Sequence, residues 1–209
     1  MSRRPSDIHP LGELSAIQPG YPFRGKLPLD AAGDAFVVQF RHVVAGEPIV
    51  DKEGEALDRV ALQGRKRPTY LQSGDVLFMA KGTRNDAAVI GQVPEYTVCT
   101  PNFYHIRLKP KSALIPEFLA WQLNYTDAQR YFTTCSQGSA APSITKSQLA
   151  KLPIAIPPIE KQRLLVKLAG AAIREQQLLN QSIENRQRMI DAVGRQILHP
   201  DIKTGNSTL

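Results

Sequence analysis

The sequence predicts an α+β fold: one mixed α/β domain with a twisted sheet, followed by a long C-terminal α-helix that forms an antiparallel coiled coil. Two observations support this prediction. Short apolar runs separated by glycine and proline occur throughout residues 1–156, which is typical of strands joined by turns. From residue 157 to residue 199 the pattern changes to apolar residues at steps of four and three, which indicates a helix. Residues 200–209 are expected to form a flexible tail.

The expected elements of the first domain are mostly strands, with two helices near its end. Residues 1–34 are rich in proline and glycine and are expected to be irregular, and residues 47–58 are expected to form an acidic loop. A helix is expected over residues 116–132, because proline suits a first helical turn. A shorter helix over residues 143–152 takes Ser143 as its N-cap. The expected strands cover residues 35–44, 76–80, 87–93, 96–99, 103–109 and 153–156.

The long helix carries a stripe of residues that repeats every 3.5 positions on average, which is the seam of a coiled coil. A helix of about forty residues is about 60 Å long, and it cannot bury such a stripe against itself. We therefore expect a partner helix. The residues of this seam, which we interpret as a dimer interface, are Leu165, Ala169, Ala172, Gln176, Leu179, Ile183, Arg186, Ile190, Val193 and Ile197.

The seam is symmetric about Gln181. Its two polar members, Gln176 and Arg186, lie equally far from that position in the sequence, as do Ala172 and Ile190. An antiparallel homodimer would place Gln176 against Arg186 and small residues against large ones, and a buried polar pair fixes the register of such a dimer. In the alternative, the helix packs against its own domain and its polar residues face water.

Composition favours an anionic partner. The chain of 209 residues has a formal net charge of +7 and a sequence pI near 9.5, and nucleic acid is the commonest partner of such a protein. No apolar run approaches 18 residues, so we expect no membrane span and a cytoplasmic location. Cys99 and Cys135 do not form a zinc-binding pattern, and both are expected to be buried thiols.

Two segments carry ordered motifs. Residues 70–90 read YLQSGDVLFMAKGTRNDAAVI, with the pattern L-x-x-G-D before an apolar strand and a small basic loop after it. Residues 138–165 read GSAAPSITKSQLAKLPIAIPPIEKQRLL, with a Gly-Ser loop, I-x-x-x-x-L, an apolar strand, and P-P-x-E-x-Q opening the long helix. Together they resemble the specificity (S) subunit of Type I restriction-modification systems. The segments LGEL at 11–14 and GYPFR at 20–24 also fit the opening of that family.

The resemblance implies a function, a partner and a stoichiometry. A full S subunit resembles two such units in tandem, whereas this sequence has one target recognition domain, at 1–156, and one helix, at 157–199. The chain therefore resembles a half-length form, and a homodimer would recognise a bipartite inverted DNA target. The resemblance implies that it directs an adenine-N6 methyltransferase, which binds the helices and holds S-adenosylmethionine, and that a restriction subunit can join. The chain itself is expected to bind no cofactor.

Candidate DNA-binding residues are side-chain donors on loops that contain glycine or several cations. Each of these loops can instead be an ordinary solvated loop, and that alternative stays open. Trp121, Tyr125 and Phe132 recur at helical spacing and are expected in the core, and His42 and His105 are expected to be structural histidines without matched partners. The candidates for DNA binding are Arg24, Lys26, Arg65, Lys66, Arg67, Lys81, Thr83, Arg84, Asn85, Gln137, Ser139 and Lys146.

The sequence lacks the motifs of the enzymes that modify DNA. The pair Pro157-Pro158 is preceded by Ile156 rather than by Asn or Asp, and no glycine-rich phosphate loop is present. The acidic residues Asp51, Glu53, Glu55 and Asp58 are interpreted as a solvated loop rather than as a metal site. We therefore expect no catalytic residue and no metal. The competing hypotheses are a coiled-coil protein–protein adaptor without DNA sequence readout and a cryptic nuclease.

Overall fold

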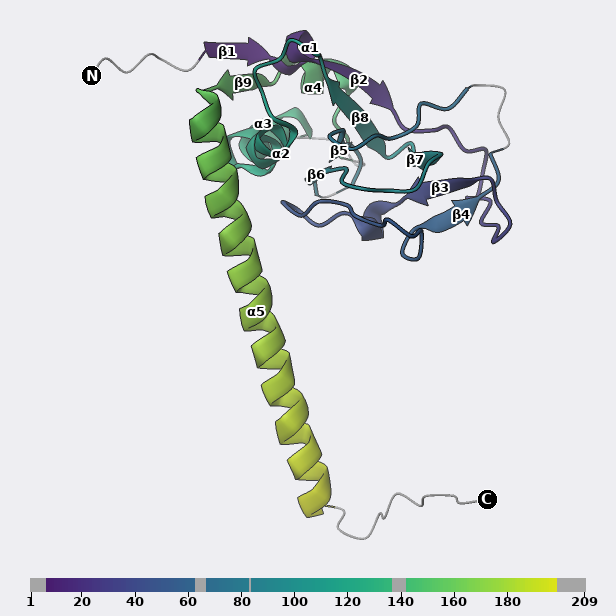
Figure 1. The fold of residues 1–209 in the computed structure, drawn as a ribbon, viewed down its shortest axis with the longest axis vertical. Coiled ribbons are helices and arrows are strands. Elements are labelled where there is room, and N and C mark those ends of the chain that lie inside the picture. The colour runs from purple at the N-terminus through teal and green to yellow at the C-terminus, as the bar shows by residue number, and fades with distance from the viewer. Residues whose placement is uncertain (1–6, 63–66, 83, 137–141, 199–209) are drawn as a thin grey trace, which may run out of the picture. The chain divides into compact units, whose positions relative to one another are not determined.

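The structure is a computed structural model, and it describes residues 7–62, 67–82, 84–136 and 142–198 (Figure 1). The chain divides into two compact units, residues 1–170 and residues 171–209. The second unit contains most of the long helix α5, Ile159–Leu198, and the first unit contains its opening turns.

In the described part of the first unit the strands form three sheets (Figure 1). A four-stranded antiparallel sheet has the order β2 (Ser15–Pro19), β8 (Phe103–Leu108), β5 (Val76–Met79), β6 (Ala87–Val89). A three-stranded sheet has the order β4 (Asp58–Val60), β3 (Ala35–Val38), β7 (Thr97–Cys99), with β3 and β7 parallel. A two-stranded sheet joins β1 (Asp7–Pro10) and β9 (Pro153–Ile156).

Short helices complete the first unit. Four of those described are α1 (Leu11–Leu14), α2 (Pro116–Asn124), α3 (Thr126–Ser136) and α4 (Lys146–Lys151), and a 3-10 turn covers Phe40–His42. Among the described residues, no helix is both long and apolar enough to cross a membrane.

Strand β5 is buried on both faces, and this explains its unbroken apolar run. Successive side chains of a strand point to opposite faces of its sheet. Val76 and Phe78 accordingly belong to the core cluster that includes helices α2, α3 and α4. Leu77 and Met79 belong to a second cluster, which includes residues of the three-stranded sheet. The sheet of β5 therefore forms a layer between two cores.

The predicted fold class is confirmed. The described residues form a mixed α+β unit with twisted sheets and one long C-terminal helix of 40 residues. Strand β9 has the predicted bounds, and β5, β7 and β8 lie within the predicted ranges. The strand predicted over residues 87–93 is shorter, since β6 ends at Val89.

The prediction of irregular structure over residues 1–34 is wrong for the segment 7–19. This segment forms β1, α1 and β2. β1 pairs with β9 and β2 pairs with β8, so each strand is stabilised by a partner at least 85 residues away in the sequence, as the pairs Pro19–Tyr104 and Asp7–Ile156 show. The local abundance of glycine and proline carries no information on such long-range pairing.

Other predicted bounds also need correction. The strand expected to reach residue 44 ends at Val38, because the chain turns into a 3-10 helix in which the N–H groups of His42 and Val43 donate to the carbonyls of Gln39 and Phe40. The helix expected over residues 116–132 is broken at Tyr125, whose backbone is extended, and it continues as α3.

The N-cap of α4 is Thr145 rather than Ser143. The Thr145 hydroxyl accepts the N–H of Gln148, and the Gln148 side chain accepts the N–H of Thr145, which is a complete capping box. Ser143 instead forms an isolated bridge with Lys81.

The acidic segment at 47–58 is not simply solvated. Asp51 is buried, and its carboxylate accepts the backbone N–H groups of Glu55, Ala56 and Leu57. Burial alone would raise the pKa of Asp51, but these hydrogen bonds outweigh it and lower the pKa. Asp51 therefore organises this loop.

Not every residue expected in the interior lies there. Phe132 is buried, Trp121 is half-buried, and Tyr125 is exposed and stacks on Trp121 with ring centroids 4.7 Å apart. Cys99 is buried, which raises the pKa of its thiol to about 12, whereas Cys135 is half-buried.

Candidate DNA interface

Two loops that the sequence marked separately lie side by side. The loop after β5 pairs with the segment that precedes α4: Gly82 donates to the carbonyl of Pro142 at 3.2 Å, and Ile144 donates to the carbonyl of Ala80 at 2.8 Å. Lys81 and Ser143 form an isolated β-bridge between them. We call the residues 80–82, 84–86 and 142–146 the loop pair. Lys81, Arg84 and Lys146 belong to it.

The loop pair presents cationic side chains, and its backbone includes a positive φ at Gly82 that favours glycine. Lys81 and Lys146 are exposed and have no ion-pair partner among the described residues. Arg84 is exposed and lies 3.4 Å from a carboxylate oxygen of Asp86. Gly82 has a φ of 103°, which side chains disfavour, and open space surrounds the position of a Cβ there. Lys81, Arg84 and Lys146 are therefore exposed to solvent, where a large anion such as DNA can reach them.

Asn85 has a structural contact within the same loop. Its side-chain N–H donates to the backbone carbonyl of Met79 at 3.0 Å. The backbone carbonyl of Asn85 accepts a hydrogen bond from the side-chain amide of Gln129. These bonds close the loop and fasten it to α3. The amide nitrogen of Asn85 is therefore engaged in holding the loop.

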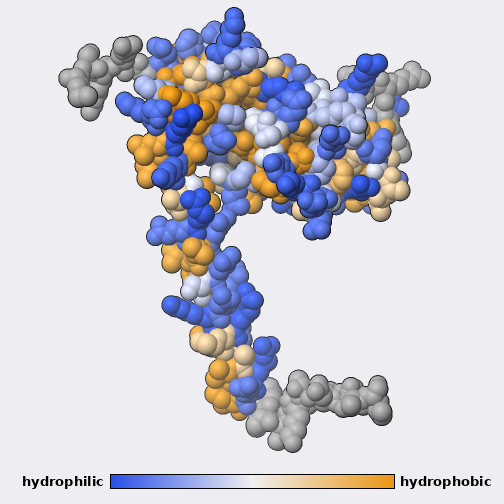
Figure 2. All heavy atoms as spheres, in the orientation of Figure 1, coloured by the Kyte–Doolittle hydropathy of each residue, from blue (hydrophilic) through white to orange (hydrophobic). Residues whose placement is uncertain are grey.

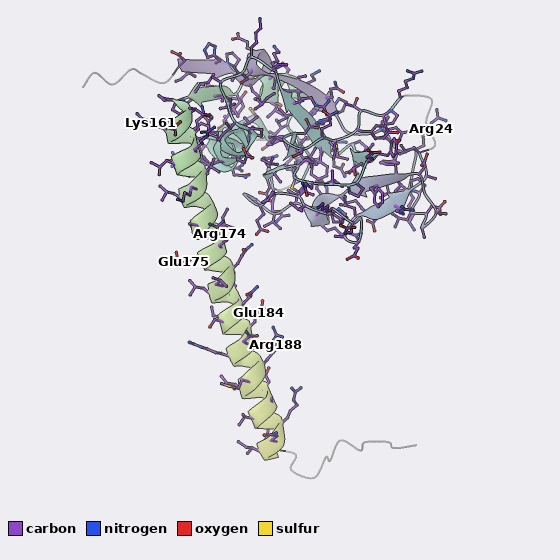
Figure 3. All side chains as sticks on the ribbon, in the orientation of Figure 1. Arg24, Lys161, Arg174, Glu175, Glu184 and Arg188 are labelled. Carbon is purple, nitrogen blue, oxygen red and sulfur yellow. The ribbon has the colours of Figure 1, made fainter. Side chains whose placement is uncertain are left out.

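A second group of cations lies near residues 20–28. Arg24 and Lys26 line a small hollow together with Tyr21 and Pro22, and Arg67 lines a neighbouring pocket to which Tyr21 and Pro22 also contribute. Figure 3 shows Arg24 on the side of the first unit that is opposite to Lys161 at the start of α5. The candidate residues thus fall into two groups, the loop pair and this second group.

Five of the candidate residues lie outside the described part of the chain. These are Arg65, Lys66, Thr83, Gln137 and Ser139.

Sequence reasoning missed a buried ionic cluster at the start of β5. Arg107 donates to both carboxylate oxygens of Asp75 at 2.7 Å, and the backbone N–H of Gln72 donates to the same carboxylate at 2.7 Å. Nε2 of His105 lies 2.7 Å from Oδ2 of Asp75, so the expectation of a histidine without a matched partner is wrong. The motif L-x-x-G-D contained the signal, since Asp75 is its last residue.

The cluster fixes β5 to β8 electrostatically. Burial of Asp75 would raise its pKa, but the hydrogen bond from Arg107 and the contact with His105 outweigh burial, and the pKa of Asp75 is lowered. The same pairing raises the pKa of Arg107. Arg107 also donates to the carbonyl of Tyr70, which draws the segment before β5 into the cluster.

Gln162 was also missed, although it is the glutamine of the P-P-x-E-x-Q motif. Its side chain is fully buried. The amide oxygen accepts the N–H of Ile115 at 3.0 Å, and the amide nitrogen donates to the carbonyls of Ala113 and Pro157, each at 2.8 Å. One glutamine therefore fastens the first turn of α5 to the segment before α2.

Within the first unit, the opening turns of α5 also pack against the domain. Leu165 and Val166 are partly buried against the core cluster that contains β5 and helices α2 to α4. Leu165, the first residue of the proposed seam, therefore has contacts within its own chain.

Farther along α5 the seam is exposed to solvent. Leu179, Ile183 and Ile190 are 54%, 64% and 60% exposed. Figure 2 shows hydrophobic residues on the surface of this helix among hydrophilic ones, and Figure 3 shows Arg174 and Arg188 pointing away from it. An exposed helix with this many large apolar side chains has an apolar surface that needs a partner.

The sequence of this chain matches the family described as Type I restriction modification DNA specificity domain over residues 57–185. None of the curated proteins searched matches the sequence. Solved structures match the fold at low sequence identity.

One such structure, described as the basis of complex assembly and conformational transition of the type I R-M system, has a TM-score of 0.67 and 16% identity. The HsdS subunit from Thermoanaerobacter tengcongensis has a TM-score of 0.59 and 17% identity, and the Type-I S subunit from M. genitalium has 0.59 and 13%.

The extent of these matches is uneven between the chains. The matches cover 95%, 87% and 97% of this chain but only 46%, 41% and 48% of the solved chains, in the same order. The chain thus spans less than half of the length of these relatives. At such low identity the structures show a shared fold, while the sequence match covers more than half of the chain. The chain belongs to the family of Type I restriction-modification DNA specificity domains.

Proposed function

We propose that two copies of this chain form the DNA-reading subunit of a Type I-like modification enzyme. The family consists of non-catalytic specificity subunits that recognise DNA. In our proposal the dimer directs an adenine-N6 methyltransferase, together with a restriction subunit where one is present, to a bipartite inverted target. Residues 1–156 recognise one half-site, and the helix at 157–199 mediates dimerisation and docking of the methyltransferase subunit.

The observation that carries the proposal is the self-complementary seam of α5, which is exposed beyond the opening turns of the helix. The seam residues mirror one another about Gln181, so that an antiparallel partner of the same sequence matches them without a change of register. Such a dimer has a twofold axis, and a protein with a twofold axis recognises two identical half-sites in inverted orientation.

The cationic residues supply the DNA contacts in this proposal. The loop pair, together with Arg24, Lys26 and Arg67, offers donors to phosphates and base edges. Arg65, Lys66, Thr83, Gln137 and Ser139 lie outside the described residues, and they stay in the proposed interface as predictions from the sequence. S-adenosylmethionine would be bound by the methyltransferase subunit.

A methylation map tests the proposal. The chain is produced together with an adenine-N6 methylating subunit of the Type I class, and the positions of N6-methyladenine in the host DNA are determined by sequencing. We expect methylation at one motif made of two inverted identical half-sites separated by a spacer of constant length. Methylation without a motif, or at a motif with two different half-sites, contradicts the proposal.

A further inference from the structure

A pocket of about 340 Å³ lies in the first unit beside the second group of cations. It is formed by the end of β2 and the residues after it, by the segment 67–69, and by residues 99–105. Its lining includes Gln18, Tyr21, Arg67, Thr69, Cys99 and His105, together with four prolines. This volume falls in the range of sites that bind small organic groups.

One buried polar atom of the pocket-lining residues lacks a partner among the described residues. The hydroxyl of Tyr21, a residue that is 8% exposed, has no hydrogen bond. Nε2 of His105, by contrast, lies 2.7 Å from Oδ2 of Asp75 and belongs to the ionic cluster. Buried polar groups in native proteins nearly always have a partner, so the unpaired hydroxyl of Tyr21 indicates a polar ligand.

The walls and the mouth of the pocket narrow the class of ligand. Four prolines and the ring of Tyr21 offer apolar surfaces suited to the faces of a planar group. At the rim, Thr69 donates to the side chain of Gln18 at 3.0 Å, and the exposed Arg67 has no ion-pair partner among the described residues. A planar heterocycle that carries a phosphate fits both features, because arginine binds phosphate through paired N–H donors.

A second groove of similar size provides a contrast. It measures about 360 Å³ and is lined by aromatic side chains, among them Trp121 and Tyr125, and by the exposed Ile8. Among the described residues that line it, Asp127 is the one charged residue and none is a cation. This groove could hold an apolar group, but it lacks a counter-charge for phosphate.

We propose that the pocket lined by Tyr21, Arg67 and His105 binds one nucleotide, with the base between the apolar walls and the phosphate at Arg67. The inference rests on the proposed function, in which the chain binds DNA. A nucleotide in this pocket can come from two sources: a base extruded from duplex DNA or a free mononucleotide. Extrusion of a base costs stacking and pairing energy, and that cost is smallest when the nucleotide is already unpaired.

Duplexes that differ in one nucleotide separate the two sources. Binding of the full chain is measured for a fully paired duplex and for the same duplex with one additional unpaired 2-aminopurine nucleotide. Binding of dAMP, dGMP, dCMP and dTMP is measured by calorimetry. If DNA is the source, we expect the unpaired nucleotide to strengthen binding about tenfold, which corresponds to about 1.4 kcal/mol. If a free nucleotide is the source, a mononucleotide binds and the unpaired nucleotide gives no advantage.

Three variants locate the effect. Thr69→Phe fills the mouth of the pocket and should abolish whichever binding is observed. Tyr21→Phe removes the unpaired hydroxyl, so it should weaken that binding while leaving the melting temperature unchanged or higher. Ile8→Phe places a phenylalanine in the second groove instead and should have no effect on binding.

The outcomes for the pocket and for the proposed function are distinct. The pocket proposal is overturned if neither the unpaired nucleotide nor a mononucleotide binds preferentially, or if Thr69→Phe and Ile8→Phe behave alike. If Thr69→Phe retains salt-dependent binding of the paired duplex, the proposed function is supported whether or not the pocket binds a nucleotide. Absence of all duplex binding refutes the proposed function, and mononucleotide binding remains a separate result.

Discussion

At the scale of single residues, buried polar side chains hold the first unit together. Asp75 is 3% exposed as a side chain and has Arg107, His105 and the N–H of Gln72 around it. A buried carboxylate without such partners would be strongly destabilising. Asp75, which directly precedes β5, therefore helps to hold β5 against β8 through its ion pair with Arg107 of β8.

The lowered pKa of Asp75 predicts how stability depends on pH. Burial opposes ionisation, while Arg107 and His105 favour it and prevail. Because the folded-state pKa is below the unfolded value of about 3.9, the ionised form stabilises the fold above that pH. This stabilisation is lost as the pH falls through the folded-state pKa.

Replacement of Arg107 by methionine tests this cluster. We expect a loss of about 2 kcal/mol near neutral pH, less than the roughly 3–5 kcal/mol of a fully buried pair. The reduction follows because the side chain of Arg107 is 37% exposed and solvent screens it. Urea unfolding between pH 3 and pH 7 should show the loss shrinking towards acid pH.

Arg130→Met is the matched control for Arg107→Met. Arg130 forms an exposed ion pair with Asp127 at 3.8 Å. Its replacement should change stability by no more than about 0.5 kcal/mol at any of these pH values. A loss for Arg107→Met that is equally large at pH 3 and pH 7 contradicts the role given to the Asp75 carboxylate.

Residue roles were the least predictable part of the molecule. A sequence shows that His105 and Asp75 exist but not that antiparallel pairing places Leu77 beside His105 and so brings the two side chains together. The same holds for Asn85. In the sequence its side-chain amide is a candidate donor to DNA, whereas in the structure it donates to the carbonyl of Met79. Such contacts depend on long-range register, which residue type does not encode locally.

At the scale of elements, the start of α5 is held by one amide. Gln162 satisfies the backbone groups of Ile115, Ala113 and Pro157. This explains why a polar residue occupies a fully buried position in a helix that otherwise carries its polar residues outside.

Gln162→Leu should destabilise the first unit by about 3 kcal/mol, because it leaves buried backbone groups without partners. Helical content should change little, since the rest of α5 does not depend on this contact. Chemical unfolding and circular dichroism measure the two effects. Glu160→Ala serves as control: Glu160 is exposed, its ion pair with Arg163 is 3.8 Å long, and its loss should be near neutral. Equal effects of the two substitutions would show that Gln162 is not the anchor.

The loop pair leads to a separate prediction. Lys81→Ala combined with Arg84→Ala should weaken binding to duplex DNA and reduce its salt dependence, because fewer phosphates are neutralised. The melting temperature should change little, since both side chains are exposed. Fluorescence anisotropy at two salt concentrations measures the effect. The control Lys52→Ala with Lys111→Ala removes the same charge from exposed positions outside both cation groups. Indistinguishable affinities of the two double variants would remove the loop pair from the interface.

Elements were predictable where local pattern dominates. The apolar runs of β5 and β9 and the proline-free repeat of α5 each identified an element correctly. β1 and β2 were missed because their stability comes from pairing with β9 and β8. The break between α2 and α3 at Tyr125 was missed because no proline or glycine marks it.

At the scale of the whole molecule, the account depends on the pairing of two helices. The large apolar side chains of the second unit are exposed in the single chain. A seam sustained over about four heptads is long enough to predict a coiled coil. The pairing itself stays a prediction from the symmetry of the sequence.

Leu179→Asp combined with Ile183→Asp should convert the dimer into monomers, because both charges would be buried at the centre of the seam. Light scattering measures the mass. Gln181→Asp with Asn185→Asp introduces the same charges at the same spacing outside the seam and should leave the dimer intact. A seam variant that remains dimeric would refute the interface.

The direction of the two helices is tested most directly by distances between spin labels. A single cysteine is placed at Gln181, Arg188 or Arg195 in a Cys135→Ser background, and Cys99 stays unlabelled because it is buried and its thiol pKa is about 12. In an antiparallel dimer centred on residue 181, the two labels are separated along the helix axis by nearly zero for position 181. The separation is about 21 Å for position 188 and about 42 Å for position 195, at about 1.5 Å rise per residue. Three short and equal separations would mean parallel helices, and the inverted-target account would then be wrong.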